Sequence, residues 1–227
     1  MAVRAVLFDA GNTLVYLDQE RMAGLFLEAG VVTDAEQVRE AELRARAKLH
    51  EGIQAGQVGT EPELWHQYFL ALFKGSGVPD DRLEDVGLRL RDEHHRDHMW
   101  TGTEPGTHEA LEELRSAGLR LAVISNADGR MADVLDRCGL TTYFDFVIDS
   151  ETVGVEKPDP AIFLDACQRL ELEPSECLYV GDLYQVDYQG STAAGLQGVL
   201  FDPLRLHEGR TPRVSDLAEL TTQLVAR

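Results

Sequence analysis

The regular alternation of strand and helix patterns after residue 100 restricts the fold of this chain more than any other feature of its sequence. Short apolar runs follow one another there, separated by segments with helical periodicity; the runs are LRLAVIS (119–125), FDFVID (144–149), CLYVGD (177–182) and GVLFD (198–202). Strands joined by helices run parallel, because each helix carries the chain back across one face of the sheet and the next strand starts at the same edge as the one before. The sequence therefore predicts an α/β fold, with a Rossmann-like parallel sheet and helices on both faces.

Residues 17–99 interrupt this alternation, because they contain only helical patterns. One pattern spans 36–49, another begins at Asp80, and between them an apolar face is made by Leu64, Trp65, Tyr68, Phe69, Leu72 and Phe73. This aromatic stripe is typical of a helical core, with substrate lining or a dimer face as the alternatives. A strand pattern at 3–8 must pair with strands that come after residue 118. We therefore expect a discontinuous Rossmann-like core of residues 1–16 and 100–227, and an inserted all-helical domain of residues 17–99.

The charge balance and the cysteines limit the partners and the compartment. The chain has 40 acidic and 21 basic residues and a formal net charge of −19, so a nucleic-acid backbone would be repelled. It contains neither 18 consecutive apolar residues nor a signal-peptide pattern. Cys138, Cys167 and Cys177 lie far apart among apolar neighbours, which favours reduced, buried thiols. We expect a cytoplasmic monomer or homodimer without nucleic-acid or membrane partners.

Polar side chains follow several of the predicted strands at the point where each strand ends. Asp9 follows strand 3–8, Ser125 and Asn126 end strand 119–125, and Asp182 ends strand 177–182. Lys157 lies in the loop after strand 144–149. Taken singly, such residues are typical of turns and caps. Ligands of parallel sheets bind beyond the carboxyl ends of the strands, so we expect these five side chains to meet at one edge.

A set of carboxylates at one edge of a sheet favours a bound cation. Carboxylates in one crevice raise one another's pKa unless a cation joins them, and Mg²⁺ takes oxygen ligands from one or two carboxylates together with a substrate phosphate. Lys157 would add a positive charge for an anion. The sequence therefore predicts a site for Mg²⁺ and a small phosphorylated substrate.

Four segments, in this order and spacing, resemble the four motifs of the haloacid dehalogenase superfamily, most of whose members are phosphate-transferring hydrolases; the segments are FDAGNTL (8–14), VISNAD (123–128), EKPDPAIF (156–163) and VGDLYQVDYQGSTAAG (180–195). The resemblance covers essentially the whole chain. The insert at 17–99 matches the helical cap of the superfamily. Residues 119–202 are especially similar to the branch of haloacid dehalogenase-like hydrolase domain-containing protein 3.

The resemblance implies a role for each matching residue. Asp9 would attack phosphorus and form an aspartyl-phosphate, which water then hydrolyses. Mg²⁺ would be held by Asp9, the backbone carbonyl of Gly11, and Asp182. The phosphoryl group would be bound by Ser125, Asn126 and Lys157. Behind them, Asp187 would orient Lys157 or a metal-bound water, and Thr13 would fix the loop after Asp9.

Gly11 departs from the pattern of the family. Most phosphatases of the superfamily carry a second aspartate there, which protonates the leaving group and later activates water, and glycine can do neither. One interpretation is a Mg²⁺-dependent phosphohydrolase that is slow on ordinary alkyl phosphates, or that uses another acid, such as Asp128 or a cap residue, or that prefers leaving groups that need no proton. Another is phosphonatase- or dehalogenase-like chemistry, in which Lys48 on a predicted cap helix would be the phosphonatase lysine. The last is a non-catalytic protein that binds phosphate and metal.

Other motifs point to weaker alternatives. His94 and His98 have the i, i+4 spacing that can bind zinc from one helix face, although a solvated helix face is the simpler interpretation. The sequence contains neither GxxxxGK[ST] nor GxGxxG, which argues against nucleoside-triphosphate switches and dinucleotide-dependent oxidoreductases.

Overall fold

The computed structural model describes residues 2–57, 62–210 and 212–225. Residues 1, 58–61, 211 and 226–227, which fall within the predicted domains, lie outside the described residues. The chain forms two compact units, one of Met1–Tyr16 with Thr103–Arg227, and the other, here called the helical unit, of Leu17–Gly102. Among the residues that the structure describes, none of the helices has the length and apolarity needed to span a membrane.

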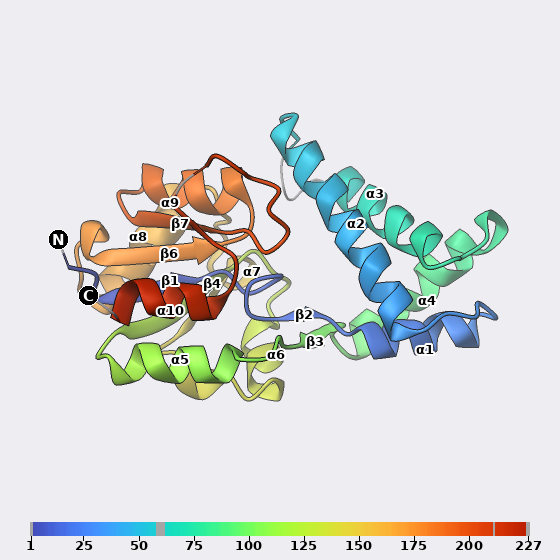
Figure 1. The fold of residues 1–227 in the computed structure, drawn as a ribbon, viewed down its shortest axis with the longest axis horizontal. Coiled ribbons are helices and arrows are strands. Elements are labelled where there is room, and N and C mark those ends of the chain that lie inside the picture. Colours follow the sequence, from blue (N-terminus) through green and yellow to red (C-terminus); the bar gives the residue numbers. More distant parts are fainter. Residues whose placement is uncertain (1, 58–61, 211, 226–227) are drawn as a thin grey trace. The chain divides into compact units, whose positions relative to one another are not determined.

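The first unit is built on a parallel sheet (Figure 1). Its strands, in spatial order, are β5 (Val147–Asp149), β4 (Arg120–Ser125), β1 (Ala5–Phe8), β6 (Cys177–Gly181), β7 (Gln197–Phe201) and β8 (Arg213–Val214). Strand β1 lies between β4 and β6, so that Leu7 is opposite Ala122 on one side and Tyr179 on the other. The first strand of the chain therefore pairs only with strands that come after the helical unit, and the predicted parallel α/β sheet is confirmed.

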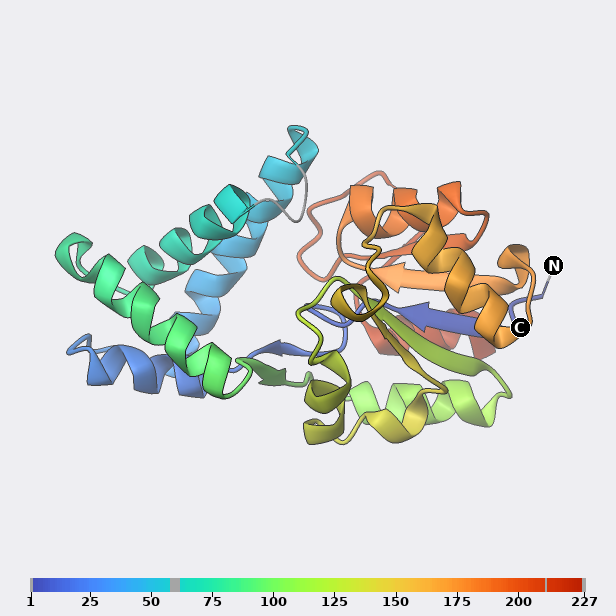
Figure 2. The same ribbon diagram turned by 180° about the vertical axis from the view of Figure 1, so that it is seen from behind.

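Helices cover both faces of this sheet, as predicted. Figures 1 and 2 show α8 and α10 on opposite faces. The helices of this unit are α5 (Thr107–Ser116), α6 (Met131–Arg137), α7 (Ser150–Val153), α8 (Pro160–Leu170), α9 (Gly190–Ala193) and α10 (Leu217–Val225). Helix α8 begins where the Asp159 side chain accepts a hydrogen bond from the N–H of Ala161, with Pro160 at its start. Its apolar side, including Phe163, packs against Tyr179 and other buried residues of the sheet.

Two segments of this unit differ from the prediction. The strand predicted over 144–149 is regular only at Val147–Asp149. The helical segment expected between strands 177–182 and 198–202 is not one regular helix but a π-helical turn, Tyr184–Gln189, followed by the short α9. The wider turn has a local cause, because Asp187 bends back to accept a hydrogen bond from the N–H of Leu183 at 2.9 Å.

Within its described residues, the helical unit contains α1 (Gln19–Glu28), α2 (Ala35–Gln54), α3 (Pro62–Gly75) and α4 (Leu83–Arg96), with a 3₁₀ turn at Asp80–Arg82. The chain enters and leaves it through a pair of short strands, β2 (Tyr16–Leu17) and β3 (Trp100–Gly102). Helix α1 was not predicted, although Asp18 caps it and its apolar side is buried. Helices α2 and α3 approach closely, since a Cβ placed on Gly75 would lie 2.8 Å from that of Ala41.

The aromatic stripe of α3 has two environments. Tyr68 and Phe73 are buried, and Phe73 meets Phe26 of α1 edge to face at 5.7 Å. Trp65 and Phe69 are half-buried and line a groove of about 940 Å³ between α3 and α4. The prediction of a helical core is therefore correct for Tyr68 and Phe73, whereas Trp65 and Phe69 face a groove within the helical unit.

Candidate active site

Asp9 lies where β1 leaves the sheet. Its backbone N–H still donates to the carbonyl of Val180 at 2.8 Å, which extends the ladder with β6 by one residue. Beyond it the chain turns tightly, and the carbonyl of Ala10 accepts the N–H groups of Leu14 and Val15 at 2.9 and 3.0 Å. Asn12 occupies the left-handed region with φ 57°. The turn therefore holds the Asp9 carboxylate at the carboxyl edge of the sheet.

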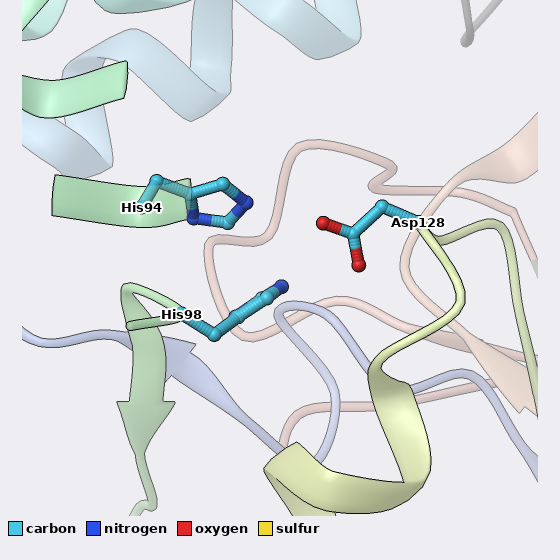
Figure 3. Close-up of side chains that lie close together, drawn as sticks. All are labelled: His94, His98 and Asp128. Carbon is cyan, nitrogen blue, oxygen red and sulfur yellow. The ribbon is translucent and has the colours of Figure 1, made fainter. Parts of the chain in front are cut away.

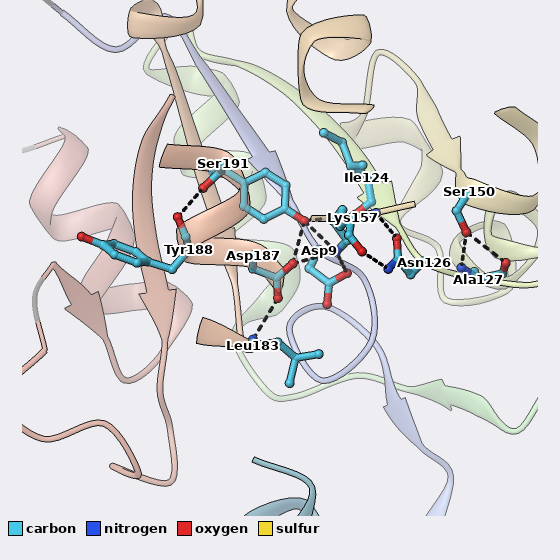
Figure 4. Close-up of polar contacts among 11 residues, drawn as sticks. Asp9, Ile124, Asn126, Ala127, Ser150, Lys157, Leu183, Asp187, Tyr188 and Ser191 are labelled. Atoms are coloured by element: carbon cyan, nitrogen blue, oxygen red, sulfur yellow. Dashed lines mark hydrogen bonds and ion pairs between the residues drawn. The ribbon is translucent and has the colours of Figure 1, made fainter. Parts of the chain in front are cut away.

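The Lys157 ammonium forms the centre of a buried polar network (Figure 4). Its Nζ donates to Asp9 Oδ1 at 2.7 Å, to Asp187 Oδ1 at 2.8 Å and to the Tyr179 hydroxyl at 2.8 Å. The second oxygen of Asp9 points away from Lys157 (Figure 4). One side chain, from the loop between α7 and α8, thus joins the end of β1 to β6 and the turn that follows it.

Asp182 completes a cluster of carboxylates with Asp9 and Asp187. One oxygen of each lies within 4.8 Å of the others, and all three residues are buried. Burial is the main cause that raises the pKa of Asp9 from 3.8 to about 7; Lys157 opposes this rise, and the charges of Asp187 and Asp182 add to it. One ammonium cannot balance three carboxylates, so the cluster has a surplus of negative charge. Oxygen ligands with such a surplus fit a divalent cation such as Mg²⁺.

Lys157 keeps its positive charge in this cluster. Burial alone would lower the pKa of a lysine, but the charges of Asp187 and Asp9 outweigh it and raise the pKa of Lys157 above its ordinary value. The side chain is therefore an ammonium over the whole physiological range of pH.

Asn126 and Ser125 lie at the end of β4, as predicted. Ser125 is buried. The Asn126 amide is bound to the backbone of Lys157, donating from Nδ2 to the carbonyl at 2.9 Å and accepting the N–H on Oδ1 at 2.8 Å (Figure 4). These two bonds use one Nδ2 proton and Oδ1 of Asn126, and they involve neither its second Nδ2 proton nor its backbone N–H. Asn126 thus fixes the Lys157 loop, and its contact with a phosphoryl group stays a prediction.

Asp149 supports the loop after β4, which carries Asn126, and was missed by the sequence analysis. Its carboxylate accepts the backbone N–H groups of Gly129, Met131 and Glu151 at 3.0–3.2 Å. An aspartate directly before SETV is a typical helix N-cap, which is the signal that could have identified it. The loop that carries Asn126 is therefore held at both ends.

Gly11 and Thr13 lie in the turn after Asp9. A Cβ built on Gly11 would have no heavy atom of the described residues within 4 Å, so a side chain has room there. The buried hydroxyl of Thr13 has no hydrogen-bond partner among those residues, and backbone bonds hold the turn. The expected roles of the Gly11 carbonyl as a metal ligand and of Thr13 as a loop anchor stay predictions.

The solvated helix face predicted for His94 and His98 is wrong, because His98 is buried and lies beyond the end of α4. His94 and His98 lie in the helical unit with ring centroids 4.4 Å apart (Figure 3). Nδ1 of His94 accepts the N–H of Met99, and Nδ1 of His98 accepts that of Trp100. These bonds place the proton of each neutral ring on Nε2, the nitrogen that a zinc ion would need, which disfavours the zinc alternative. Lys48 is exposed on α2.

Asp128 follows β4 and is exposed. Its Oδ2 accepts hydrogen bonds from Nε and from a terminal nitrogen of Arg130. Protonation would weaken this ion pair, so the arrangement does not favour Asp128 as a proton donor.

Comparison with known proteins agrees with this geometry. A family model described as haloacid dehalogenase-like hydrolase matches residues 3–195. Mouse haloacid dehalogenase-like hydrolase domain-containing protein 3 is 37% identical over 209 residues, covering 88% of this chain and 82% of its own length. Ribulose-1,5-bisphosphate 5-phosphatase of Halopiger xanaduensis is 33% identical over 207 residues, covering 88% and 84%.

Solved structures show the same fold. The magnesium-bound HAD hydrolase YfnB from Bacillus subtilis matches 99% of both chains with a TM-score of 0.72 and 22% identity. At this identity the likeness concerns the fold alone. The sequence matches, over most of the chain, confirm the predicted resemblance. This protein belongs to the haloacid dehalogenase-like hydrolases.

Proposed function

We propose that the protein is a Mg²⁺-dependent phosphohydrolase that acts on a small phosphorylated metabolite through an aspartyl-phosphate. The observation that carries this proposal is the Asp9–Lys157 pair, 2.7 Å between Oδ1 and Nζ, buried beside Asp182. A carboxylate fixed through one oxygen, with the other directed away from its partner, is arranged as a nucleophile (Figure 4). The name of the Halopiger relative, a phosphatase, supports the same reaction class.

In the proposed reaction, one residue attacks phosphorus and the others position it and the phosphoryl group. Asp9 would attack phosphorus in line, the bond from phosphorus to the leaving oxygen would break, and water would then cleave the acyl phosphate. Lys157 would oppose the protonation of Asp9 and hold its carboxylate in place. Ser125 and Asn126 would donate hydrogen bonds to phosphoryl oxygens.

Mg²⁺ would be held by Asp9, Asp182 and the carbonyl of Gly11, which supply the oxygen ligands that this ion prefers. When bound, the ion neutralises charge on the carboxylates and on the phosphoryl oxygens.

Gly11 sets the preferred leaving group. Without a carboxylic acid at this position, a poor alkoxide leaving group would depart unprotonated, and general acid catalysis is typically worth about 10²- to 10⁴-fold in rate. We infer that the enzyme favours substrates whose leaving group needs no proton, such as aryl or acyl phosphates, over alkyl phosphates.

The test is hydrolysis of p-nitrophenyl phosphate with Mg²⁺ and with EDTA. Wild-type protein should turn over only with the metal, and Asp9→Asn should lower the rate on the order of 10³-fold or more. Asp133→Asn, which changes an exposed carboxyl on α6, is the matched control and should leave the rate unchanged. Turnover that survives Asp9→Asn would overturn the proposal.

Measurements with other substrates separate the alternatives. Release of chloride from a haloacid without metal would indicate a dehalogenase. Phosphonate cleavage that is lost on Lys48→Arg would indicate a phosphonatase. Metal binding without turnover of any substrate would indicate a binding protein.

A further inference from the structure

The Lys157 ammonium has all three of its protons directed at protein acceptors. An ammonium carries three donors, and within the described residues Nζ meets Asp9, Asp187 and Tyr179 at 2.7–2.8 Å. Two of these acceptors are carboxylates that the family motifs supply. The third is a phenol from the interior of a strand, outside the residues to which the proposed mechanism gives a role. The arrangement raises the question of what this hydroxyl does.

Tyr179 reaches the site from β6, the strand next to β1. It lies in β6 opposite Leu7, yet its hydroxyl is 3.2 Å from the carbonyl of Ile124, at the end of β4 on the other side of β1. The ring is fully buried and meets Phe163 of α8 edge to face at 5.0 Å. One phenol of β6 therefore binds both the end of β4 and the ammonium that holds Asp9.

The Tyr179 hydroxyl acts as an acceptor toward Lys157 and as a donor toward its other neighbours. Burial, followed by the charge of Asp187, raises the pKa of Tyr179 well above its ordinary value, so the phenol keeps its proton. That proton has two acceptors within 3.2 Å, the Ile124 carbonyl and Asp187 Oδ1. The oxygen lone pairs are then left for the ammonium. Nζ also lies 5.4 Å from the ring centroid.

Loss of this acceptor would change the direction of the ammonium. A buried N–H without a partner is costly, so Lys157 would rotate until its third proton found another acceptor. Rotation about the Cε–Nζ bond and its neighbours would also move the proton that is now directed at Asp9 Oδ1. Small displacements of a nucleophile in an active site have large effects on rate.

We propose that Tyr179 is a positioning residue: its hydroxyl oxygen takes the third proton of Lys157 and so fixes the ammonium on Asp9 Oδ1. The proposal rests on the proposed function, because it assigns Asp9 as the nucleophile. The hydrogen bonds of the Tyr179 hydroxyl go to Lys157, Asp187 and the Ile124 carbonyl, and the proposed mechanism gives none of these three the attack on phosphorus or the binding of metal. Its removal should therefore affect the chemical step and not the binding of substrate or metal.

The kinetic test compares Tyr179→Phe with a packing control. Tyr179→Phe keeps the ring and its contact with Phe163 and removes only the hydroxyl. We expect kcat for p-nitrophenyl phosphate to fall on the order of 10- to 100-fold, with KM and the Mg²⁺ concentration for half-maximal rate changed less than about threefold. Phe163→Leu loosens the packing around the ring and keeps the hydroxyl. It should lower the melting temperature but leave kcat within about threefold of wild type.

Two kinetic outcomes would overturn the proposal. One is a Tyr179→Phe enzyme with wild-type kcat. The other is an equal fall of kcat in Tyr179→Phe and Phe163→Leu, which would show that packing, and not the hydroxyl, is responsible.

A spectroscopic test decides the role of Tyr179 without turnover. The chain has three lysines, of which Lys48 and Lys74 are exposed. In protein labelled with ¹⁵N-lysine, the ammonium of an exposed lysine exchanges its protons rapidly with water, whereas a buried, hydrogen-bonded one exchanges slowly. We expect one slowly exchanging Nζ signal in wild type and in Phe163→Leu, and its loss or a several-fold faster exchange in Tyr179→Phe.

The two tests separate the two proposals. Wild-type protein that hydrolyses no phosphate ester with Mg²⁺ would refute the proposed function, while the ammonium signal would still report whether Tyr179 holds Lys157. An Nζ signal in Tyr179→Phe with wild-type shift and exchange rate would refute the role of Tyr179, whatever the activity.

Discussion

At the scale of single residues, Asp9 is a carboxyl group in a setting that disfavours its charge. Burial raises its pKa to about 7, and only Lys157 offsets this effect within the cluster of three carboxylates. Because the folded and unfolded states bind the proton of such a group with different pKa values, the stability of the protein depends on pH even without substrate.

We expect metal-free wild type to lose stability relative to Asp9→Asn as the pH rises from about 4 to about 7. The folded state binds the Asp9 proton more tightly than the unfolded chain, whose carboxyl has a pKa of 3.8. Binding of this proton therefore adds to the free energy of unfolding in full below about pH 4, and the addition is lost as the pH rises to about 7. Melting temperatures of both proteins in EDTA across this range would check it. A difference that stays constant with pH would contradict the prediction.

Gly11→Asp should raise the activity on alkyl phosphates. The position has room for a side chain, and a carboxyl there could protonate the leaving alkoxide. We expect a gain of about tenfold or more for an alkyl phosphate and little change for p-nitrophenyl phosphate, whose leaving group needs no proton. The ratio of the two rates is the measurement. Gly11→Asn, similar in size but without an acidic proton, is the control, and an equal gain in both variants would argue against proton transfer.

Some site residues could be predicted from the sequence because they follow buried strands. Asp9, Ser125 and Asp182 each stand at such a boundary, and a polar residue directly after an apolar run is visible in one dimension. Tyr179 could not be found in this way, since an aromatic residue inside CLYVGD indicates a core position. The remaining signal is that a buried tyrosine hydroxyl needs a partner, and only the fold shows that the partner is Lys157.

At the scale of elements, the end of β6 is shaped to receive Asp187. A Cβ on Gly181 would lie 2.4 Å from Asp187 Cγ, so the carboxylate packs directly against the strand backbone. The π-helical turn Tyr184–Gln189 brings Asp187 back over this glycine, where it binds both Lys157 and the N–H of Leu183. The end of β6 and the π-helical turn therefore act together to place the Asp187 carboxylate against Lys157.

Gly181→Ala should displace Asp187 and disable the site. We expect kcat to fall on the order of 100-fold, because Lys157 loses one of its carboxylate partners. Gly198→Ala is the matched control: a Cβ on Gly198 of β7 would lie 2.8 Å from Thr192 of α9, so it also crowds a strand, and Asp187 is not among its three nearest contacts. Rates and melting temperatures of both variants are the measurements. Equal losses of kcat in the two proteins would contradict the explanation.

Long elements were predictable and short or irregular ones were not. Helices α2, α3 and α4 each carry several turns of apolar periodicity, which sequence patterns detect well. The strands β2 and β8 have two residues each, too few to show any alternation. The π-helical turn depends on contacts of Asp187 that no local pattern contains. Helix α1 is different, because Met22, Leu25 and Phe26 have helical spacing and could have been recognised.

At the scale of the whole molecule, the net charge of −19 makes the folded chain repel itself. Monovalent salt screens this repulsion over about 8–10 Å at physiological strength. A divalent ion in the carboxylate cluster would act in addition, because folding brings the three carboxylates together.

We expect Mg²⁺ to stabilise the protein beyond its effect on ionic strength. A ligand at 100 times its Kd adds about 2.7 kcal/mol to the free energy of unfolding. Melting temperatures in MgCl₂ and in NaCl of equal ionic strength would measure the difference, which Asp182→Asn should reduce. Equal melting temperatures in the two salts would show that Mg²⁺ acts only by screening.

The position of β1 in the sheet has a consequence for synthesis. Strand β1, which ends just before Asp9, is translated before the helical unit, whereas its hydrogen-bonding neighbours, β4 and β6, are translated only after that unit. During that interval its apolar side chains are exposed without a sheet to join, which makes this nascent segment a natural client for chaperones.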